Sequence, residues 1–176
     1  MKKYTGIALM LVLAACSNSD NPKETKSSEE AVVTTASAGV QLENPKLQAI
    51  YDQYSILKDA LVSAEYDIAK TAASTLQKDL SGFEGCENTA LIAQKISDAK
   101  DLAGQRKEFT YLSSDLIALF NHATITKGTI YVEHCPMANK GEGGSWLSSH
   151  KKIQNPYFGD EMMECGSVTD EFKSAS

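Results

Sequence analysis

Apolar residues recur at spacings of three or four from Asn44 to Gly82, which is the periodicity of an amphipathic helix. Asn44-Pro45 is a typical helix start, because asparagine caps free amides and proline fits the first helical position. Gly82 and Gly85 are typical of a helix end. We therefore predict one long helix. Its apolar stripe consists of Leu47, Ile50, Tyr51, Tyr54, Leu57, Leu61, Ala64, Ile68, Ala72, Leu76 and Leu80.

Two further helical segments follow, one starting near Asn88 and one after a break between Asp98 and Gly104. Each carries apolar residues at helical spacing. Because every apolar stripe must be buried against another element, we predict a mainly α fold. An antiparallel bundle of three or four helices satisfies this requirement.

After Ala123 the pattern changes to alternation. Thr129–Cys135 alternates β-branched and aromatic residues with polar ones, which indicates a strand with His134 and Cys135 on opposite faces. The sequence predicts turns at Lys140–Ser145, which is rich in glycine, and at Asn155–Gly159.

A second strand is predicted in the C-terminal segment. Met163–Val168 is a candidate to pair with the first strand, which would bring Cys165 near Cys135. We expect residues 129–168 to form a small C-terminal cap on the bundle, a β-hairpin with irregular connections.

Residues 1–15 have the features of a secretory leader: Lys2 and Lys3, a short apolar run, and small residues before Cys16. The sequence Leu13-Ala-Ala-Cys16 is similar to a bacterial lipobox, in which the cysteine is acylated. We therefore expect a lipoprotein signal peptide over 1–15, lipidated Cys16 and a flexible tether over 16–43, and a single folded domain over 44–172.

Charge argues against nucleic-acid binding. Without Lys2 and Lys3 the chain has 15 basic against 23 acidic residues, a formal charge of −8, which repels phosphate backbones. Acyl chains rather than a basic patch would hold the protein at a membrane. We expect a periplasm-facing protein of the bacterial cell envelope, anchored to the outer rather than the inner membrane.

Soft ligands gather near the C-terminus. The segment Glu133–Gly166 holds two of the four cysteines and all three methionines beyond the leader. Thiolate and thioether groups select Cu(I), and silver behaves similarly. The candidate metal ligands are Cys135, Met137, Met162 and Cys165, with His134 or His150 completing the site.

Other interpretations of this cluster stay open. Cys135 and Cys165 are candidates for a structural disulfide in an oxidising compartment, and the methionines for packing. A zinc site of His134, Cys135, Cys165 and His150 has suitable ligands but lacks zinc-finger spacing. Cys86 is open between a buried thiol, an extra ligand and a disulfide partner.

Enzymatic motifs are lacking in the sequence. We find no Cys-x-x-Cys pair, nucleophile elbow, phosphate-binding glycine loop or pair of zinc histidines on a helix face. Arg106, the only arginine, is more typical of a structural ion pair than of a catalytic group. We predict that the protein is not an enzyme.

A family resemblance rests on "QRKEFTYLSSDLIAL", "VEHCPMANKGEGGSWLS" and "KIQNPYFGDEMMECGSVTDEF". Over about Lys46 to Phe172 the chain resembles the bacterial domain of unknown function 3347, found in secreted or lipid-anchored proteins and as a C-terminal module of heavy-metal efflux adaptors. The resemblance implies a helical bundle with a small cap and a link to copper or silver handling. Its pattern falls on His134, Cys135, Pro136, Met137, Trp146, Asn155, Pro156, Tyr157, Gly159, Met162, Cys165 and Gly166.

Two functions from different classes follow from the sequence. The first is soft-metal binding, of Cu(I) or Ag(I), for sequestration or for delivery to an efflux adaptor or another copper-handling envelope protein. The second is a non-metal interaction module, whose cap is held by a Cys135–Cys165 disulfide and docks through Trp146 and Tyr157. A thiol redox protein is a third possibility, and it would require a low pKa at Cys135.

Overall fold

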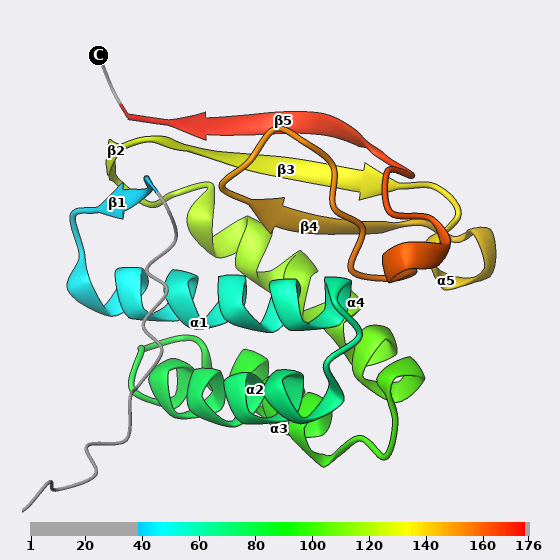
Figure 1. Ribbon diagram of the computed structural model, residues 1–176. Helices are drawn as coiled ribbons and strands as arrows, with labels where there is room; N and C mark the ends of the chain where they lie inside the picture. Colours follow the sequence, from blue (N-terminus) through cyan, green and yellow to red (C-terminus); the bar gives the residue numbers. More distant parts are fainter. Residues whose placement is uncertain (1–38, 175–176) are drawn as a thin grey trace, which may run out of the picture. The chain divides into compact units, whose positions relative to one another are not determined.

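Helix α1 (Pro45–Val62) starts where the sequence predicts in the computed structural model, which describes residues 39–174 (Figure 1). The Asn44 side chain accepts hydrogen bonds from the backbone amides of Lys46 and Leu47, at 2.9 and 3.4 Å. These bonds satisfy amides that lack a partner within the helix.

The prediction of one long first helix is wrong. The helix ends at Val62, and after a turn at Ala64 a second helix, α2 (Tyr66–Ser81), begins. Ala64 has a left-handed φ of 57°, and the amide of Glu65 donates to the carbonyl of Ala60 at 2.8 Å. This geometry ends a helix and is most often made by glycine. The apolar spacing continues across the break, so periodicity alone did not reveal it.

Helices α3 (Glu87–Asp98) and α4 (Leu102–Phe120) follow the predicted segments. Asp101 caps α4 by accepting a hydrogen bond from the amide of Gly104 at 2.7 Å. Helices α2 and α3 lie on the side of α1 away from the sheet, and α4 packs against α3 (Figure 1). The described residues therefore contain a bundle of four long helices, within the predicted range.

The C-terminal part forms a three-stranded antiparallel sheet in the order β4-β3-β5. Strand β3 (Thr129–Cys135) has the predicted bounds. Strand β5 (Ser167–Lys173) pairs with it as predicted, but it begins four residues after the start of the predicted Met163–Val168 and overlaps that segment only at residues 167–168. Strand β4 (Gly144–Ser148) lies largely beyond the turn that the sequence predicts at Lys140–Ser145 and was missed. The prediction of a small β cap on a helical bundle is confirmed.

Several short elements flank the three-stranded sheet. After β3, α5 (Ala138–Gly141) is a tight turn rather than a regular helix, since two of its residues are left-handed. A 3₁₀ turn, η1 (Gly159–Glu161), precedes β5. Strands β1 (Gln41–Leu42) and β2 (Ile125–Lys127) pair at the other end. The folded part thus begins before residue 44, inside the segment predicted as tether.

A buried hydrogen-bond network joins the sheet to the helices. The Tyr54 hydroxyl accepts a hydrogen bond from the Leu147 amide at 3.0 Å and lies 2.8 Å from the Ser113 hydroxyl. Tyr54 also stacks on Phe109, with ring centroids 5.5 Å apart. Strand β4 is therefore the strand held next to α1 and α4, and β5 lies farthest from α1 (Figure 1).

The leader and Cys16 lie outside the described residues. Among the helices of residues 39–174, none has both the length and the apolar character needed to span a bilayer.

Candidate functional site

Two thiols meet where β3 ends. Cys135 is the last residue of β3, and Cys165 lies in the turn that enters β5. Their Sγ atoms are 3.0 Å apart, with both cysteines unlinked. The antiparallel register explains the meeting, because His134 is opposite Ser167 and the neighbouring residues are brought to the same end of the sheet. The sequence predicted this proximity from the pairing of the two strands.

Asn155 holds the turn that carries Cys165. Its side-chain amide donates to the carbonyl of Cys165 at 2.8 Å, and its backbone amide donates to the carbonyl of Met163 at 2.9 Å. Its side-chain oxygen accepts from the Tyr157 amide at 2.8 Å. Because Asn155 is fully buried, these bonds are shielded from water. From the sequence, Asn155 was expected only in a turn and in the family pattern, and its Asn-Pro context was the available signal for its role.

The two thiols differ in acidity. Burial raises the pKa of Cys135, but hydrogen bonds from Cys165, the amides of Met137 and Ala138, and Asn155 outweigh it, so the net pKa is lowered. The hydrogen bond to Cys135, together with some desolvation, raises the pKa of Cys165. Cys135 is therefore the first of the pair to become a thiolate, which is the form that binds metal or acts as a nucleophile.

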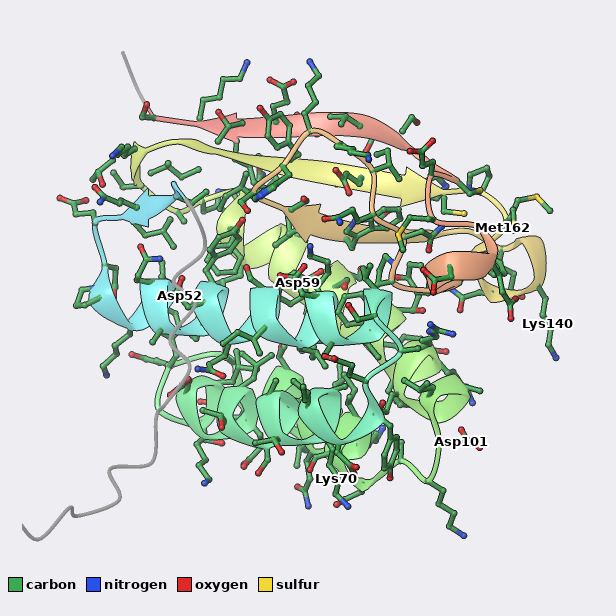
Figure 2. All side chains as sticks on the ribbon, in the orientation of Figure 1. Asp52, Asp59, Lys70, Asp101, Lys140 and Met162 are labelled. Carbon is green, nitrogen blue, oxygen red and sulfur yellow. The ribbon has the colours of Figure 1, made fainter. Side chains whose placement is uncertain are left out.

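Methionines lie on both segments that carry the thiols. Met137, two residues after Cys135, is 54% exposed, and Met162 is partly buried. The amide of Cys165 donates to the carbonyl of Met162 at 3.0 Å, which closes the turn between them. Figure 2 shows Met162 at the end of the sheet where sulfur atoms gather. Thioether side chains thus lie on the same two segments as the thiols, one of them at the surface.

His134 is not brought to the thiols. Its ring Nδ1 lies 3.0 Å from the Ser145 hydroxyl, and it lines a cavity together with Val132. Successive strand residues face opposite sides of a sheet, so the ring points away from Cys135. The predicted ligand role of His134 does not fit this arrangement.

The four residues proposed as zinc ligands are also not brought together. His150 is exposed and its ring Nδ1 lies 3.0 Å from the neighbouring Ser149 hydroxyl. Within residues 39–174, no group of three or more His, Cys, Asp or Glu side chains is arranged to hold a metal ion. Zinc prefers four such ligands. Any metal bound at the thiol pair would have to rely on thioether ligands or on low coordination.

Cys86 is a buried thiol. It is 6% exposed, belongs to the hydrophobic core next to α3, and is unlinked. Burial raises the pKa of its thiol, with smaller contributions from Glu87 and Asp115. Of the three roles that the sequence left open, packing fits best.

The predicted docking surface is absent, because Trp146 and Tyr157 are 0% and 7% exposed. Their ring centroids are 6.0 Å apart in an edge-to-face pair that fills the space between sheet and helices. Arg106 is structural but makes no carboxylate ion pair in the described part of the chain. Its guanidinium donates to the carbonyls of Pro156 and Leu61 at 2.9 and 3.0 Å.

The sequence did not predict that one carboxylate, that of Glu133, is buried. Glu133 faces Trp146 across the strand pair, is 0% exposed, and neither of its oxygens has a hydrogen-bond partner in the described residues. Burial raises the pKa of Glu133 to about 7, although the Trp146 indole and the Lys58 ammonium both lower it. Alternation predicts its face but not the depth of its burial.

Comparison with known families gives one match. Residues 50–128 match the family described as "Protein of unknown function (DUF3347)". This segment of the chain belongs to that family. No curated protein and no solved structure matches the chain.

The match bears on the helices rather than on the thiols. It covers most of α1 and all of α2, α3 and α4, and it ends at Gly128, just before β3. Of the sequence stretches that suggested DUF3347, only the one in α4 lies inside it. The family match therefore supports the bundle, and the roles of Cys135 and Cys165 rest on their geometry alone.

Proposed function

We propose that this DUF3347 protein binds soft metal ions, Cu(I) or Ag(I), through Cys135 and Cys165, with Met137 and Met162 as thioether ligands. The observation that carries the proposal is the 3.0 Å approach of the two Sγ atoms, next to methionines on the same two segments. Thiolate and thioether together favour Cu(I) over harder ions. Binding would serve sequestration or delivery rather than catalysis.

The thiol pair must open to accept an ion. Thiolate–metal bonds are about 2.3 Å long in zinc sites, so two sulfurs sharing one ion commonly lie farther apart than 3.0 Å. Cys165 is partly exposed and lies in an irregular turn, whereas Cys135 is buried in β3. The Cys165 turn is therefore the part that adjusts, and Met137 at the surface would contact the ion first.

The cellular setting is part of the same proposal. The leader, the Leu13-Ala-Ala-Cys16 sequence and the charge of the chain support a lipid-anchored protein of the bacterial envelope that faces the periplasm. The resemblance to modules of heavy-metal efflux adaptors supports a metal efflux system as the recipient. An acidic chain is a poor ligand for nucleic acid.

Anaerobic competition between reduced protein and a chromophoric Cu(I) chelator tests the metal proposal. We expect the native chain to remove Cu(I) from the chelator at a 1:1 ratio and the double variant Cys135→Ser, Cys165→Ser to lose this ability. Met137→Leu with Met162→Leu should weaken binding by about tenfold, as expected for supporting ligands. Cys86→Ala is the matched control and should bind as the native chain does.

The outcome separates metal binding from the disulfide alternative. Absence of competition by the reduced native chain, or equal binding by the Cys135→Ser, Cys165→Ser variant, rejects the proposal. A Cys135–Cys165 disulfide that persists in native buffer with reductant, detected by intact mass, would favour the structural alternative instead. That alternative already lacks its docking surface, since Trp146 and Tyr157 are buried.

A further inference from the structure

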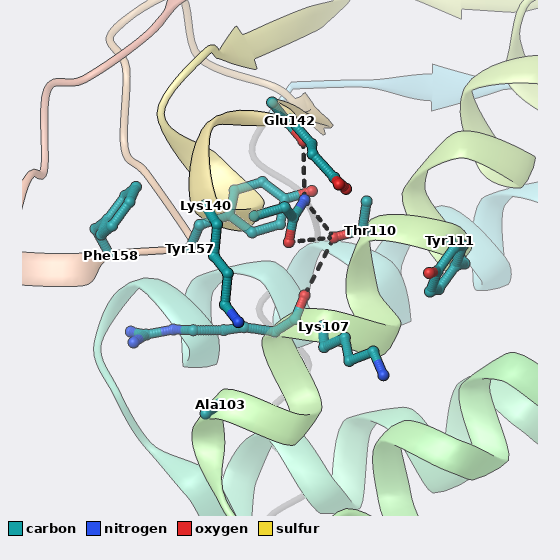
Figure 3. Close-up of a pocket in the computed structure, with 11 residues that line it drawn as sticks. Ala103, Lys107, Thr110, Tyr111, Lys140, Glu142, Tyr157 and Phe158 are labelled. Atoms are coloured by element: carbon teal, nitrogen blue, oxygen red, sulfur yellow. Dashed lines mark hydrogen bonds between the residues drawn. The ribbon is translucent and has the colours of Figure 1, made fainter.

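A cavity of about 780 Å³ opens between α4 and the α5 turn (Figure 3). Its apolar walls are the aromatic rings of Tyr111, Tyr157 and Phe158. Pockets for small molecules commonly enclose about 300–1,000 Å³ and have aromatic walls with a few polar groups. Neither Cys135 nor Cys165 lines this space, so it is distinct from the thiol pair.

The charge of the cavity is opposite to that of the chain. Its lining contains Arg106, Lys107 and Lys140 but one acidic residue, Glu142, in a chain of net charge −6. None of the ion pairs among the described residues involves Lys107 or Lys140. Three cations and one carboxylate around one space leave an excess of positive charge, which attracts an anion.

The position of Lys140 is fixed by the turn that carries it. Asn139 and Lys140 are both left-handed, with φ of 52° and 61°, which non-glycine residues rarely adopt. The Asn139 side-chain amide donates to the Thr110 hydroxyl at 3.0 Å and to the Gly143 carbonyl at 2.8 Å, which ties the turn to α4. Figure 3 shows Lys140 reaching from this turn across the cavity toward α4.

Arg106 supports the wall of the cavity and is not one of the cations offered to a ligand. Its hydrogen bonds to the carbonyls of Pro156 and Leu61 hold the loop of Tyr157 and Phe158 against the end of α1. Two of its donors are thereby occupied. Lys107 and Lys140, both exposed, are the cations available to a ligand.

We propose that this cavity binds a small organic anion with a flat aromatic body. Its acidic group lies between Lys107 and Lys140, and its ring packs against Phe158 and the small exposed part of Tyr157. The cations supply the charge complementarity, and the aromatic walls supply apolar contact area. This site operates independently of the metal proposal, because it shares no ligand with the thiol pair.

Fluorescence titration with 8-anilinonaphthalene-1-sulfonate, an aromatic anion, tests the site in the full chain. We expect saturable 1:1 binding that the double variant Lys107→Gln, Lys140→Gln weakens by about tenfold, since both charged contacts are lost. The matched control is Lys70→Gln with Lys78→Gln, on α2 and outside the cavity, which removes the same charge and should bind within twofold of the native chain. The uncharged dye N-phenyl-1-naphthylamine should not distinguish the three proteins.

Three results would overturn the anion site. These are no binding of the sulfonate dye by the native chain, equal weakening in the cavity and control variants, or an equal effect of the cavity variant on the uncharged dye. The Cys135→Ser, Cys165→Ser variant should retain dye binding, and Lys107→Gln, Lys140→Gln should retain Cu(I) binding. Failure of one proposal is therefore separable from failure of the other.

Discussion

The helical layer and the C-terminal cap both bury polar side chains, but in the helical layer these (Lys58, Thr89, Gln105 and Ser113) are a small part of a large apolar interior. The interior of α1 to α4 consists mainly of aliphatic and aromatic residues, which periodic spacing places on one face of each helix. The cap buries the Glu133 carboxyl, the Asn155 amide and the Cys135 thiol. Buried polar groups cost free energy unless they are paired, so the cap depends on a few specific contacts. The bundle therefore holds most of the apolar interior, and the cap holds the thiol pair and the buried carboxyl.

Trp146→Ala should have the largest effect on stability and should act on the cap in particular. Removing a fully buried tryptophan is expected to cost about 3–5 kcal/mol in unfolding free energy. Urea denaturation measures this loss. The Trp146 ring also lies against Gly166, next to Cys165, so the variant should increase the rate at which Cys135 and Cys165 are alkylated.

Leu76→Ala in α2 is the comparison for the helical layer. Leu76 is equally buried, and its truncation should cost about 2–5 kcal/mol. Alkylation of Cys135 and Cys165 under native conditions should stay unchanged. A similar gain in thiol reactivity in both variants would mean that the cap and the bundle open as one unit.

Glu133→Gln should change how the stability of the protein depends on pH, because the buried carboxyl lies in the cap. The pKa of Glu133 is raised by burial from 4.5 to about 7, so the folded state holds the proton more tightly than the unfolded state. Its contribution to stability is complete below pH 4.5 and is lost as the pH rises to about 7. At pH 8 the amide variant should be more stable by up to about 3 kcal/mol, since each pKa unit corresponds to about 1.4 kcal/mol.

Urea denaturation at pH 5 and pH 8 measures this difference. The two proteins should be similar at pH 5, where the native carboxyl is protonated in the fold. Glu84→Gln, an exposed residue between α2 and α3, is the control and should show no such pH dependence. A constant difference between native chain and Glu133→Gln at both pH values would contradict the burial argument.

Asn155→Ala should destabilise the cap by about 2 kcal/mol, because it leaves the Cys165 carbonyl and the Tyr157 amide without their partner. Chemical denaturation measures the loss, and hydrogen exchange of the Tyr157 amide should become faster. Asn88→Ala, exposed on α3, should change stability by less than about 0.5 kcal/mol. Equal effects of the two substitutions would show that Asn155 does not support the turn that carries Cys165.

Ala64→Gly is expected to have the smallest effect, a gain of about 0.5–1 kcal/mol in the helical layer. Glycine adopts the left-handed φ of 57° without the steric penalty that alanine has. Thermal denaturation measures the gain. Ala118→Gly, exposed within α4, should instead lose about 1 kcal/mol, and a loss at both positions would contradict the break between α1 and α2.

Local signals in the sequence predicted much of the fold. The start of α1 at Asn44-Pro45, the bounds of β3 and the break before α4 depend on capping, alternation and spacing within a few residues. Two features had no local signal. Ala64 makes a turn usually made by glycine, and β4 begins within the predicted glycine-rich turn, where only pairing with β3 defines a strand.

The sequence by itself determined which chemistry is available. It places two thiols and three thioethers on the segments around the end of β3 and before β5, in an acidic chain with a helical bundle. Tertiary structure decided which of those groups meet. Strand register brings Cys135 to Cys165, directs His134 to the opposite face and buries Glu133. The reason is physical, because side-chain direction and burial in a sheet depend on partners distant in the chain, and those partners are set only by folding.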